Sequence, residues 1–292
     1  FNFDELIILT RLMMTLWQGL CHLPTSWHPV IGKFCGGLLF IIAKNRKKIA
    51  QANIQACFPN HSKTDHKKLL HDNFLCLGRS LIETGIAWFW SNKKIQSQID
   101  YEVIGLNLLS ANNHKNGNLI IFKHSQHLEL DARLLGMNAE LYGVSRSHNS
   151  DSMNIIQDKG RLSSMKGTAD KNNPRKFMKW LKTGKNVMYA IDQDYGWNHS
   201  VRLKFFDLEA ATITTTKKIL DLTNSNLLFI NSYYKNGKLI LKLELIDNFG
   251  LDAEELAQKI NDVMQEKILK HPAEYLWAHR RFKSTLGKDF YK

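Results

Sequence analysis

Several common sources of chemistry and of covalent stability are missing from this sequence of 292 residues. It contains only four cysteines, and none of them forms a CxxC pair: Cys21, Cys35, Cys57 and Cys76. Neither a zinc ribbon nor a disulfide scaffold is therefore expected, and a reducing compartment is the simpler expectation. The G-x-S-x-G nucleophile elbow, the P-loop and the dinucleotide-binding fingerprint are also absent, so we expect no covalent serine intermediate and no cofactor.

Acidic residues are few relative to basic ones, with 27 Asp and Glu against 40 Lys and Arg and a formal net charge of +13. This excess predicts an anionic partner, which could be nucleic acid, an acidic membrane surface, or a phosphorylated or acidic substrate. The sequence shows neither a recognition helix nor aromatic residues on basic strands, which are the features that bind nucleic acid. We therefore do not expect nucleic acid as a partner. With 43% hydrophobic residues and no low-complexity linker or internal repeat, the chain is expected to fold as one domain with at most a small appendage.

Long apolar runs are concentrated near the N-terminus. Residues 6–24 are mostly apolar and long enough to cross a bilayer or lie deep in it, although Arg11 interrupts them. A second, shorter apolar run covers residues 30–43, and the basic stretch KNRKK follows it at residues 44–48. No small-residue cleavage site follows a basic n-region, so a signal peptide is not expected.

A membrane anchor and a buried core helix are both possible interpretations of these runs. Trp17, Trp27 and the basic edge favour the anchor. We therefore predict a membrane anchor over residues 1–43 and a single α/β domain over residues 44–292, which the positive-inside rule places on the cytoplasmic side. Whether the anchor spans the bilayer or only lies in it is left open.

The remaining sequence is typical of an α/β protein. Helical patterns flank the corner CFPNHS, where Pro59 and Asn60 break the first helix and Ser62 or Thr64 can cap the second. Short apolar runs then alternate with helical patterns, as expected for a sheet covered on both faces. The dipeptide Asn236-Gly237 predicts a hairpin turn, so the sheet is expected to be mixed but mostly parallel. The predicted strands begin near residues 118, 139, 186, 226 and 238.

The stretch NLIIFKHSQHLELD, residues 118–131, places two histidines and two acidic residues behind an apolar strand. His124 comes where the strand ends, a common location for sites in open α/β sheets, and a helix is expected to begin near residue 127 or 128. A bend would bring Glu129 to the imidazole, which is the arrangement that activates a hydroxyl. A metal site that uses His127 or Asp131 is an alternative, as is a polar loop without chemistry; for His127 and Asp131 we expect a solvated helix face.

Further motifs extend over nearly the whole chain. His124-x-x-x-x-Glu129 resembles the HX4(D/E) signature of the glycerolipid and lipid A acyltransferase superfamily. CFPNHS, LIETGIAWFW, GVSRSHN, GRLSSMKG, YAIDQDYG and YLWAHRRFK occur in the order seen in the late acyltransferases of lipid A biosynthesis. The chain is similar to the lauroyltransferase branch of that family more than to the myristoyltransferase branch. The resemblance implies a glycerolipid-acyltransferase-like fold and an enzyme at the cytoplasmic face of the inner membrane.

The implied reaction moves an acyl group from acyl carrier protein to a hydroxyacyl chain of a Kdo-lipid A precursor, directly within a ternary complex. The resemblance makes His124 the general base, oriented by Glu129. It also makes Arg161 a catalytic residue that contacts the oxyanion or a phosphate, and Arg146 a weaker candidate for substrate binding. The family motifs do not reveal the preferred acyl chain length.

Asp192 and Asp194 follow another predicted strand, and we expect them to organise Arg161 or Arg146 for substrate binding. Arg280, Arg281 and Lys283 form a basic cluster whose role is unassigned. Two alternatives remain: an acyltransferase for another membrane acceptor, such as a phosphatidylinositol mannoside or a lysophospholipid, and a metal-dependent hydrolase built on His124, His127 and Asp131.

Overall fold

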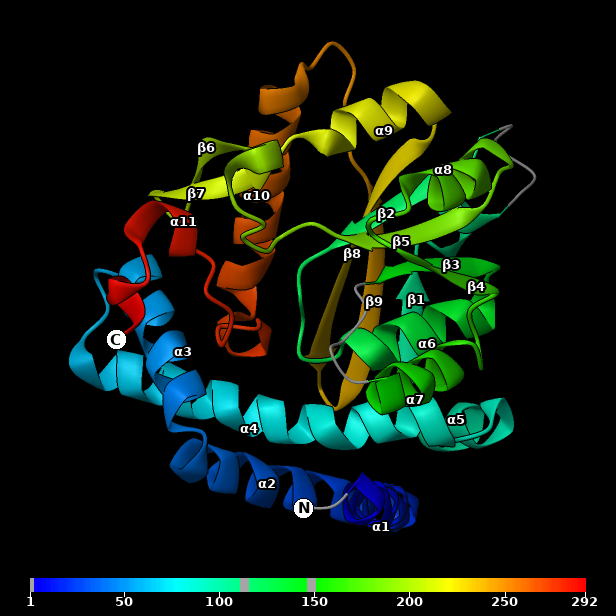
Figure 1. Ribbon diagram of the computed structural model, residues 1–292, viewed down its shortest axis with the longest axis vertical. Helices are drawn as coiled ribbons and strands as arrows, with labels where there is room; N and C mark the ends of the chain where they lie inside the picture. The colour runs from blue at the N-terminus through cyan, green and yellow to red at the C-terminus, as the bar shows by residue number, and fades with distance from the viewer. Residues whose placement is uncertain (1–2, 111–115, 146–150) are drawn as a thin grey trace.

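The computed structural model describes residues 3–110, 116–145 and 151–292 (Figure 1). It contains a central seven-stranded sheet with helices on both faces, and a separate two-stranded sheet. The strands are β1 (Tyr101–Ile104), β2 (Asn118–Phe122), β3 (Leu141–Ser145), β4 (Gly167–Asp170), β5 (Asn186–Ala190), β6 (Ser200–Phe205), β7 (Leu208–Ile213), β8 (Asn226–Lys235) and β9 (Lys238–Leu245). The helices are α1 (Phe3–His22), α2 (His28–Ile42), α3 (Lys44–Cys57), α4 (Lys63–Phe89), α5 (Asn92–Gln98), α6 (Leu128–Asn138), α7 (Asp151–Arg161), α8 (Pro174–Lys182), α9 (Thr215–Thr223), α10 (Ala253–Lys270) and α11 (Lys283–Leu286).

The strand order of the central sheet is β1-β9-β8-β2-β5-β3-β4. All neighbouring pairs are parallel except β8 and β9, which are antiparallel and are joined through the predicted turn at Asn236 and Gly237. Both turn residues have positive φ, 51° and 82°, as a two-residue hairpin of this kind requires. The predicted mixed, mostly parallel sheet is confirmed.

The side chains of β2 alternate between two apolar layers, which explains why the whole strand is buried. Leu119 and Ile121 pack in the core shared with α3, α8, α9 and α10. Ile120 and Phe122 pack in the core shared with α4 and α6. Since both faces of the strand are covered by helices, only its two ends can present polar groups to a ligand.

The predicted helix break at Pro59 and Asn60 is confirmed, since α3 ends at Cys57 and α4 begins at Lys63. Ser62 caps α4 in a capping box with Asp65, and Asp252 does the same for α10 with Glu255. Helix α8 begins directly after Asn173 and buries Phe177 and Leu181 on one face.

Helices α1 and α2 lie along the outer side of the long helix α4 (Figure 1). Gly32 and Gly36 let α2 pack closely against α4: a β-carbon at Gly36 would lie 2.5 Å from the carbonyl oxygen of Phe74. The opposite side of the two helices leaves large apolar side chains exposed. These are Leu12, Met13, Leu16, Leu20, Leu23, Trp27, Val30, Phe34, Leu38, Ile41 and Ile42, which we call the apolar face.

Within the described residues, no single helix has the length and hydropathy needed to cross a membrane. One pair of helical segments, Thr25–Ile42 and Lys44–Cys57, passes the same test only when the two are taken together, and it is bent by 93°. The predicted anchor over residues 1–43 therefore remains a proposal.

Candidate active site

His124 and Asp192 meet because their strands are neighbours. β2 and β5 pair in parallel, with Phe122 opposite Ala190, so the residues two positions further on come together at the carboxyl edge. The Nδ1 of His124 donates a hydrogen bond to one carboxylate oxygen of Asp192, and its backbone N–H donates to the other at 2.8 Å. Asp192 therefore fixes both the tautomer and the orientation of the imidazole.

The electrostatics of this pair favour a charged imidazole. Burial by itself lowers the pKa of His124, but the charge and hydrogen bond of Asp192 outweigh burial and leave the pKa raised. Burial raises the pKa of Asp192, yet the imidazolium charge and two hydrogen bonds from His124 lower it to about 2. Asp192 is therefore ionised at neutral pH and stabilises the protonated form of His124.

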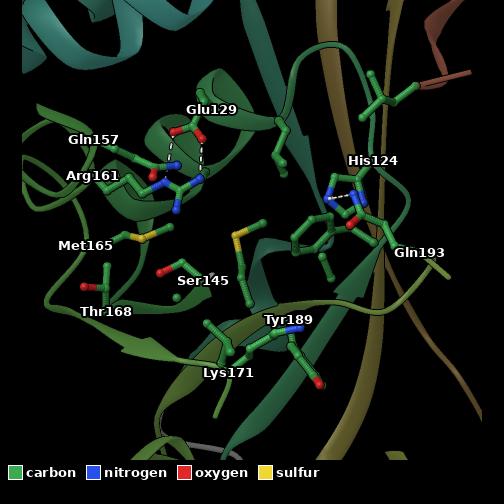
Figure 2. A pocket seen from close by; sticks show the side chains of 18 of the residues that line it. His124, Glu129, Ser145, Gln157, Arg161, Met165, Thr168, Lys171, Tyr189 and Gln193 are labelled. Atoms are coloured by element: carbon green, nitrogen blue, oxygen red, sulfur yellow. Dashed lines mark hydrogen bonds and ion pairs between the residues drawn. The ribbon is translucent and has the colours of Figure 1, made fainter. Parts of the chain in front are cut away.

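The other ring nitrogen of His124 faces the ligand side. Its Nε2 accepts a hydrogen bond from the side-chain amide of Gln193 at 3.1 Å, as Figure 2 shows. With Nδ1 protonated toward Asp192, Nε2 carries the lone pair that can take a proton from a substrate. Gln193 was not identified from the sequence, although it lies between the two aspartates that were.

The sequence predicted that Glu129 orients His124, but in the structure it does not. Its carboxylate accepts from both Nε, at 3.1 Å, and one terminal nitrogen of Arg161, and from the indole N–H of Trp88 at 2.9 Å. Glu129 sits in the first turn of α6, and its side chain extends toward α7 and α4, whereas the end of β5 lies directly beside the end of β2. The carboxylate at His124 is consequently Asp192.

Arg161 ends α7 and enters the site as one half of a bidentate ion pair. Burial raises the pKa of Glu129, but the charge and hydrogen bonds of Arg161 outweigh it and lower that pKa. The ion pair is partly buried, with 16% of the Arg161 and 15% of the Glu129 side chain exposed, and it fixes the orientation of the planar guanidinium, which suits recognition of an anionic oxygen. The preceding Gly160 is required because a β-carbon there would clash with the ring of Trp88.

His124 and the Arg161–Glu129 pair line one pocket of about 650 Å³ (Figure 2). Its volume is in the range of pockets that hold small ligands or a segment of a larger one. Apolar side chains from the sheet and from α6 contribute much of the wall, and polar side chains are grouped near the two charged pairs. The apolar lining includes Phe122, Leu128, Ala132, Val144, Met165 and Met188; the polar lining includes Ser145, Gln157, Thr168, Lys171, Gln193 and His279.

His127 and Asp131 do not lie on a solvated helix face, and that expectation is wrong. Only 1% of His127 and 4% of Asp131 is exposed. The Nδ1 of His127 lies 2.8 Å from Glu83 and its Nε2 lies 3.4 Å from Glu274, so that although burial lowers the pKa of His127, the two carboxylates raise it to about 9. Asp131 accepts hydrogen bonds from Ser125, at 2.9 Å, and from Ser232, at 2.6 Å.

These buried groups hold the loop that carries His124. Helix α4 contributes Glu83 to this network and Trp88 to the neighbouring ion pair, which gives the motif LIETGIAWFW a structural reason. The C-terminal segment fixes the other side of the loop: the N–H of Leu276 donates to the carbonyl of His124 at 2.9 Å. His127 is thus a buried cation that supports the loop.

The two aspartates do not organise Arg161, contrary to the sequence-based expectation. Asp192 bonds to His124, and Asp194 accepts from the backbone N–H of Ser284 at 2.7 Å and of Gly196 at 2.9 Å. Arg146 lies outside the described residues.

Arg281 belongs to the core. It is 3% exposed, and its guanidinium donates to the carbonyl of Ala211 at 2.7 Å. Across the described part of the chain, no group of three or more His, Cys, Asp or Glu side chains is placed to hold a metal ion.

Comparison with known proteins agrees with this arrangement. A family model described as bacterial lipid A biosynthesis acyltransferase matches residues 3–284. The chain is 35% identical over 267 residues to a lipid A biosynthesis lauroyltransferase of Escherichia coli K12, covering 88% of this chain and 86% of the relative. It is 32% identical over 259 residues to a lipid A biosynthesis palmitoleoyltransferase of the same organism, covering 87% and 84%.

The lower identity to a third relative agrees with the expected similarity to the lauroyltransferase branch. A lipid A biosynthesis myristoyltransferase of Escherichia coli K12 is only 20% identical over 267 residues, covering 87% of this chain and 79% of the relative. The two more similar relatives cover most of the chain, and the family model includes the strands and helices that bring together His124 with Asp192 and Glu129 with Arg161. The protein belongs to the bacterial lipid A biosynthesis acyltransferase family.

Proposed function

We propose that this protein transfers an acyl chain from the thioester of acyl carrier protein to a hydroxyl on a hydroxyacyl chain of a Kdo-lipid A precursor, at the cytoplasmic face of the inner membrane. The observation that carries the proposal is the pairing of His124 with Asp192 at one end of a pocket that also contains the Arg161–Glu129 pair. A base and an anion-binding group that share one partly apolar pocket are what acyl transfer to a lipid hydroxyl needs.

In the proposed reaction, Nε2 of His124 takes the proton of the acceptor hydroxyl. The oxygen then attacks the thioester carbonyl, the new C–O bond forms, and the C–S bond breaks. The imidazolium returns its proton to the thiolate that leaves, so the protein is unchanged at the end of the cycle. Because Asp192 is a buried anion beside the ring, the positive charge that develops on His124 is stabilised as it forms.

Arg161 is the candidate for stabilising the negative charge on the carbonyl oxygen. Glu129, which also accepts a hydrogen bond from the indole N–H of Trp88, holds its guanidinium, and Arg161 faces the same pocket as His124. A donor that is fixed before the reaction is more effective than a mobile one, because it needs no reorganisation in the transition state. In this scheme Glu129 positions Arg161, while Asp192 positions His124.

The test is acyl transfer by the purified protein in detergent, with labelled acyl-acyl carrier protein and a Kdo-lipid A precursor. Wild type should acylate the acceptor, and His124→Ala should lose nearly all of the rate while remaining folded. Asp221→Asn is a matched surface control, because Asp221 only pairs with Lys217 at the protein surface.

Transfer by His124→Ala at the wild-type rate would refute the proposed base. Loss of wild-type activity on addition of a chelator would favour the metal-dependent alternative. Acylation of a lysophospholipid or a phosphatidylinositol mannoside in preference to the lipid A precursor would transfer the same chemistry to another acceptor.

The membrane part of the proposal rests on the apolar face of α1 and α2. Phe34 is 72% exposed, Ile41 67% and Val30 66%. The basic residues 44–48 begin α3 directly after α2 in the chain, and basic residues next to an apolar segment are typical of segments that bind anionic lipid surfaces. We propose that residues 1–43 attach the acyltransferase domain of residues 44–292 to the membrane.

Sedimentation with vesicles of anionic and of neutral lipids checks this attachment. Val30→Asp and Phe34→Asp together should release the protein from both. Leu222→Asp is the matched control and should not, because Leu222 is an exposed leucine of α9, which lies at the other end of the molecule from α1 and α2 in Figure 1. Equal vesicle binding by wild type and the double variant would contradict the role given to the apolar face.

A further inference from the structure

A second hollow, of about 360 Å³, adjoins the active-site pocket. The two share Arg46 and His279 in their walls, so a ligand could occupy both at once. The second hollow lies between α3 and the C-terminal segment, which Figure 1 shows next to each other. Its lining is Asn45, Arg46, Ile49, Asp194, His279, Arg280 and Lys283.

Three cations converge on this hollow from two parts of the chain. Arg46 comes from α3, and one of its terminal nitrogens donates to the carbonyl of Ala278 at 3.1 Å, which ties it to the C-terminal segment. Arg280 stacks over the ring of Tyr291 at 5.9 Å, and its buried Nε has no hydrogen-bond partner in the described part of the protein. Lys283 is exposed at the rim.

None of these cations is neutralised by a carboxylate within the described residues. Asp194 is the acidic residue in the wall, but its oxygens accept from the backbone N–H of Ser284 at 2.7 Å and from the hydroxyl of the same residue at 2.7 Å. Burial lowers the pKa of His279 to about 4, so that its ring is neutral at pH 7. Three cations therefore stand against one carboxylate that already has its hydrogen bonds.

We propose that this hollow binds a phosphate group of one of the two substrates while the reacting end of that substrate lies in the adjoining pocket. Two guanidinium groups and one ammonium provide converging donors, and Arg offers phosphate a planar pair of N–H groups. The inference rests on the proposed acyl transfer, and the phosphate can come from either substrate: from the sugar of the acceptor or from the phosphodiester in the prosthetic arm of the carrier protein.

Binding of inorganic phosphate, measured by calorimetry on the full chain, tests the site without reference to activity. The double variant Arg280→Gln/Lys283→Gln should bind phosphate at least about tenfold more weakly than wild type, as expected for the loss of charged hydrogen bonds. Lys288→Gln is the matched control, because Lys288 is an exposed lysine of the same segment and does not line the hollow. Lys283→Gln alone tests the site without disturbing a buried group.

Steady-state kinetics then identifies the source of the phosphate. If the phosphate belongs to the acceptor, the KM for the lipid rises about tenfold in the double variant while the KM for acyl carrier protein and kcat stay within about twofold. If it belongs to the donor, the KM for acyl carrier protein rises instead. Lys288→Gln should change neither.

Each remaining outcome overturns a stated part of the inference. Phosphate binding that is the same in wild type and the double variant, or absent from wild type at millimolar phosphate, overturns the site. Weaker phosphate binding with both KM values unchanged overturns its role for the substrates. If wild type binds phosphate through these residues but transfers no acyl chain, the proposed function fails and the site stands.

Discussion

Replacing Asp192 by Asn tests the central pair of the site with little change in shape. The variant keeps a side chain of the same size next to His124 but removes the negative charge that faces the ring. In wild type, this pair lowers the pKa of Asp192 from 3.8 to about 2, even though burial acts in the opposite direction. The charge and hydrogen bonds of His124 are the main cause of this lowering, and the charge of Arg281 adds to it.

By reciprocity, the imidazolium of His124 loses the stabilisation that Asp192 provides when the charge is removed. Two pKa units correspond to a factor of about 100. If His124 is the base, this charge forms in the transition state, and kcat in Asp192→Asn should fall by about 100-fold or more. The pKa of His124 is raised in wild type, and the base must be neutral, so the acid limb of the pH–rate profile should move to lower pH in the variant.

The assay is the rate of acyl transfer between pH 5 and 9 for wild type, Asp192→Asn and the surface control Asp221→Asn, with circular dichroism to confirm folding. A rate within threefold of wild type would refute the role of Asp192. An acid limb that stays at the wild-type pH would show that the titrating group is not the histidine beside Asp192.

Three further predictions concern the supports of the site. Arg161→Lys should lower kcat by about 100-fold because Lys cannot form the bidentate pair with Glu129, and single-turnover kinetics measures this; retention of the full rate would contradict the proposed role of the guanidinium. His127→Gln should lower the free energy of unfolding by roughly 3 kcal/mol at pH 7, because the buried carboxylates of Glu83 and Glu274 lose one cationic partner and are left with Arg79; urea titration measures this. The pKa of His127 is raised to about 9, so in wild type this contribution is complete below pH 6.5 and is lost as the pH rises through 9, and a pH-independent difference between the two proteins would argue against it. Gly160→Ala should displace the ring of Trp88 and lower both the thermal midpoint and kcat, whereas an unchanged midpoint would mean that the ring moves without cost.

The elements were predictable where their signals are local. The strand over residues 118–122, the hairpin at Asn236 and the capped helices α4 and α10 all follow from periodicity, turn residues and caps within a few positions. The membrane interpretation of residues 1–43 was harder, because apolar side chains that pack on α4 and those that stay exposed are interspersed along the same helices. Composition reports how many apolar residues there are but not which of them find a partner.

The sequence by itself determined the mixed α/β class, the position of His124 at the end of a strand and the similarity to a family of acyltransferases, and it singled out Arg161 as a candidate site residue. It could not determine that Asp192, 68 residues further on, is the partner of His124, because that depends on which strand lies next to β2. The HX4E spacing joined His124 to Glu129 along the chain, but the helix directs Glu129 to Arg161 instead. Tertiary structure also decided that His127 is a buried cation, since Glu83 and Glu274 reach it from segments 44 and more residues away in sequence. Strand order and helix packing are set by the burial of the whole core, so contacts between distant polar residues emerge only when that core is assembled.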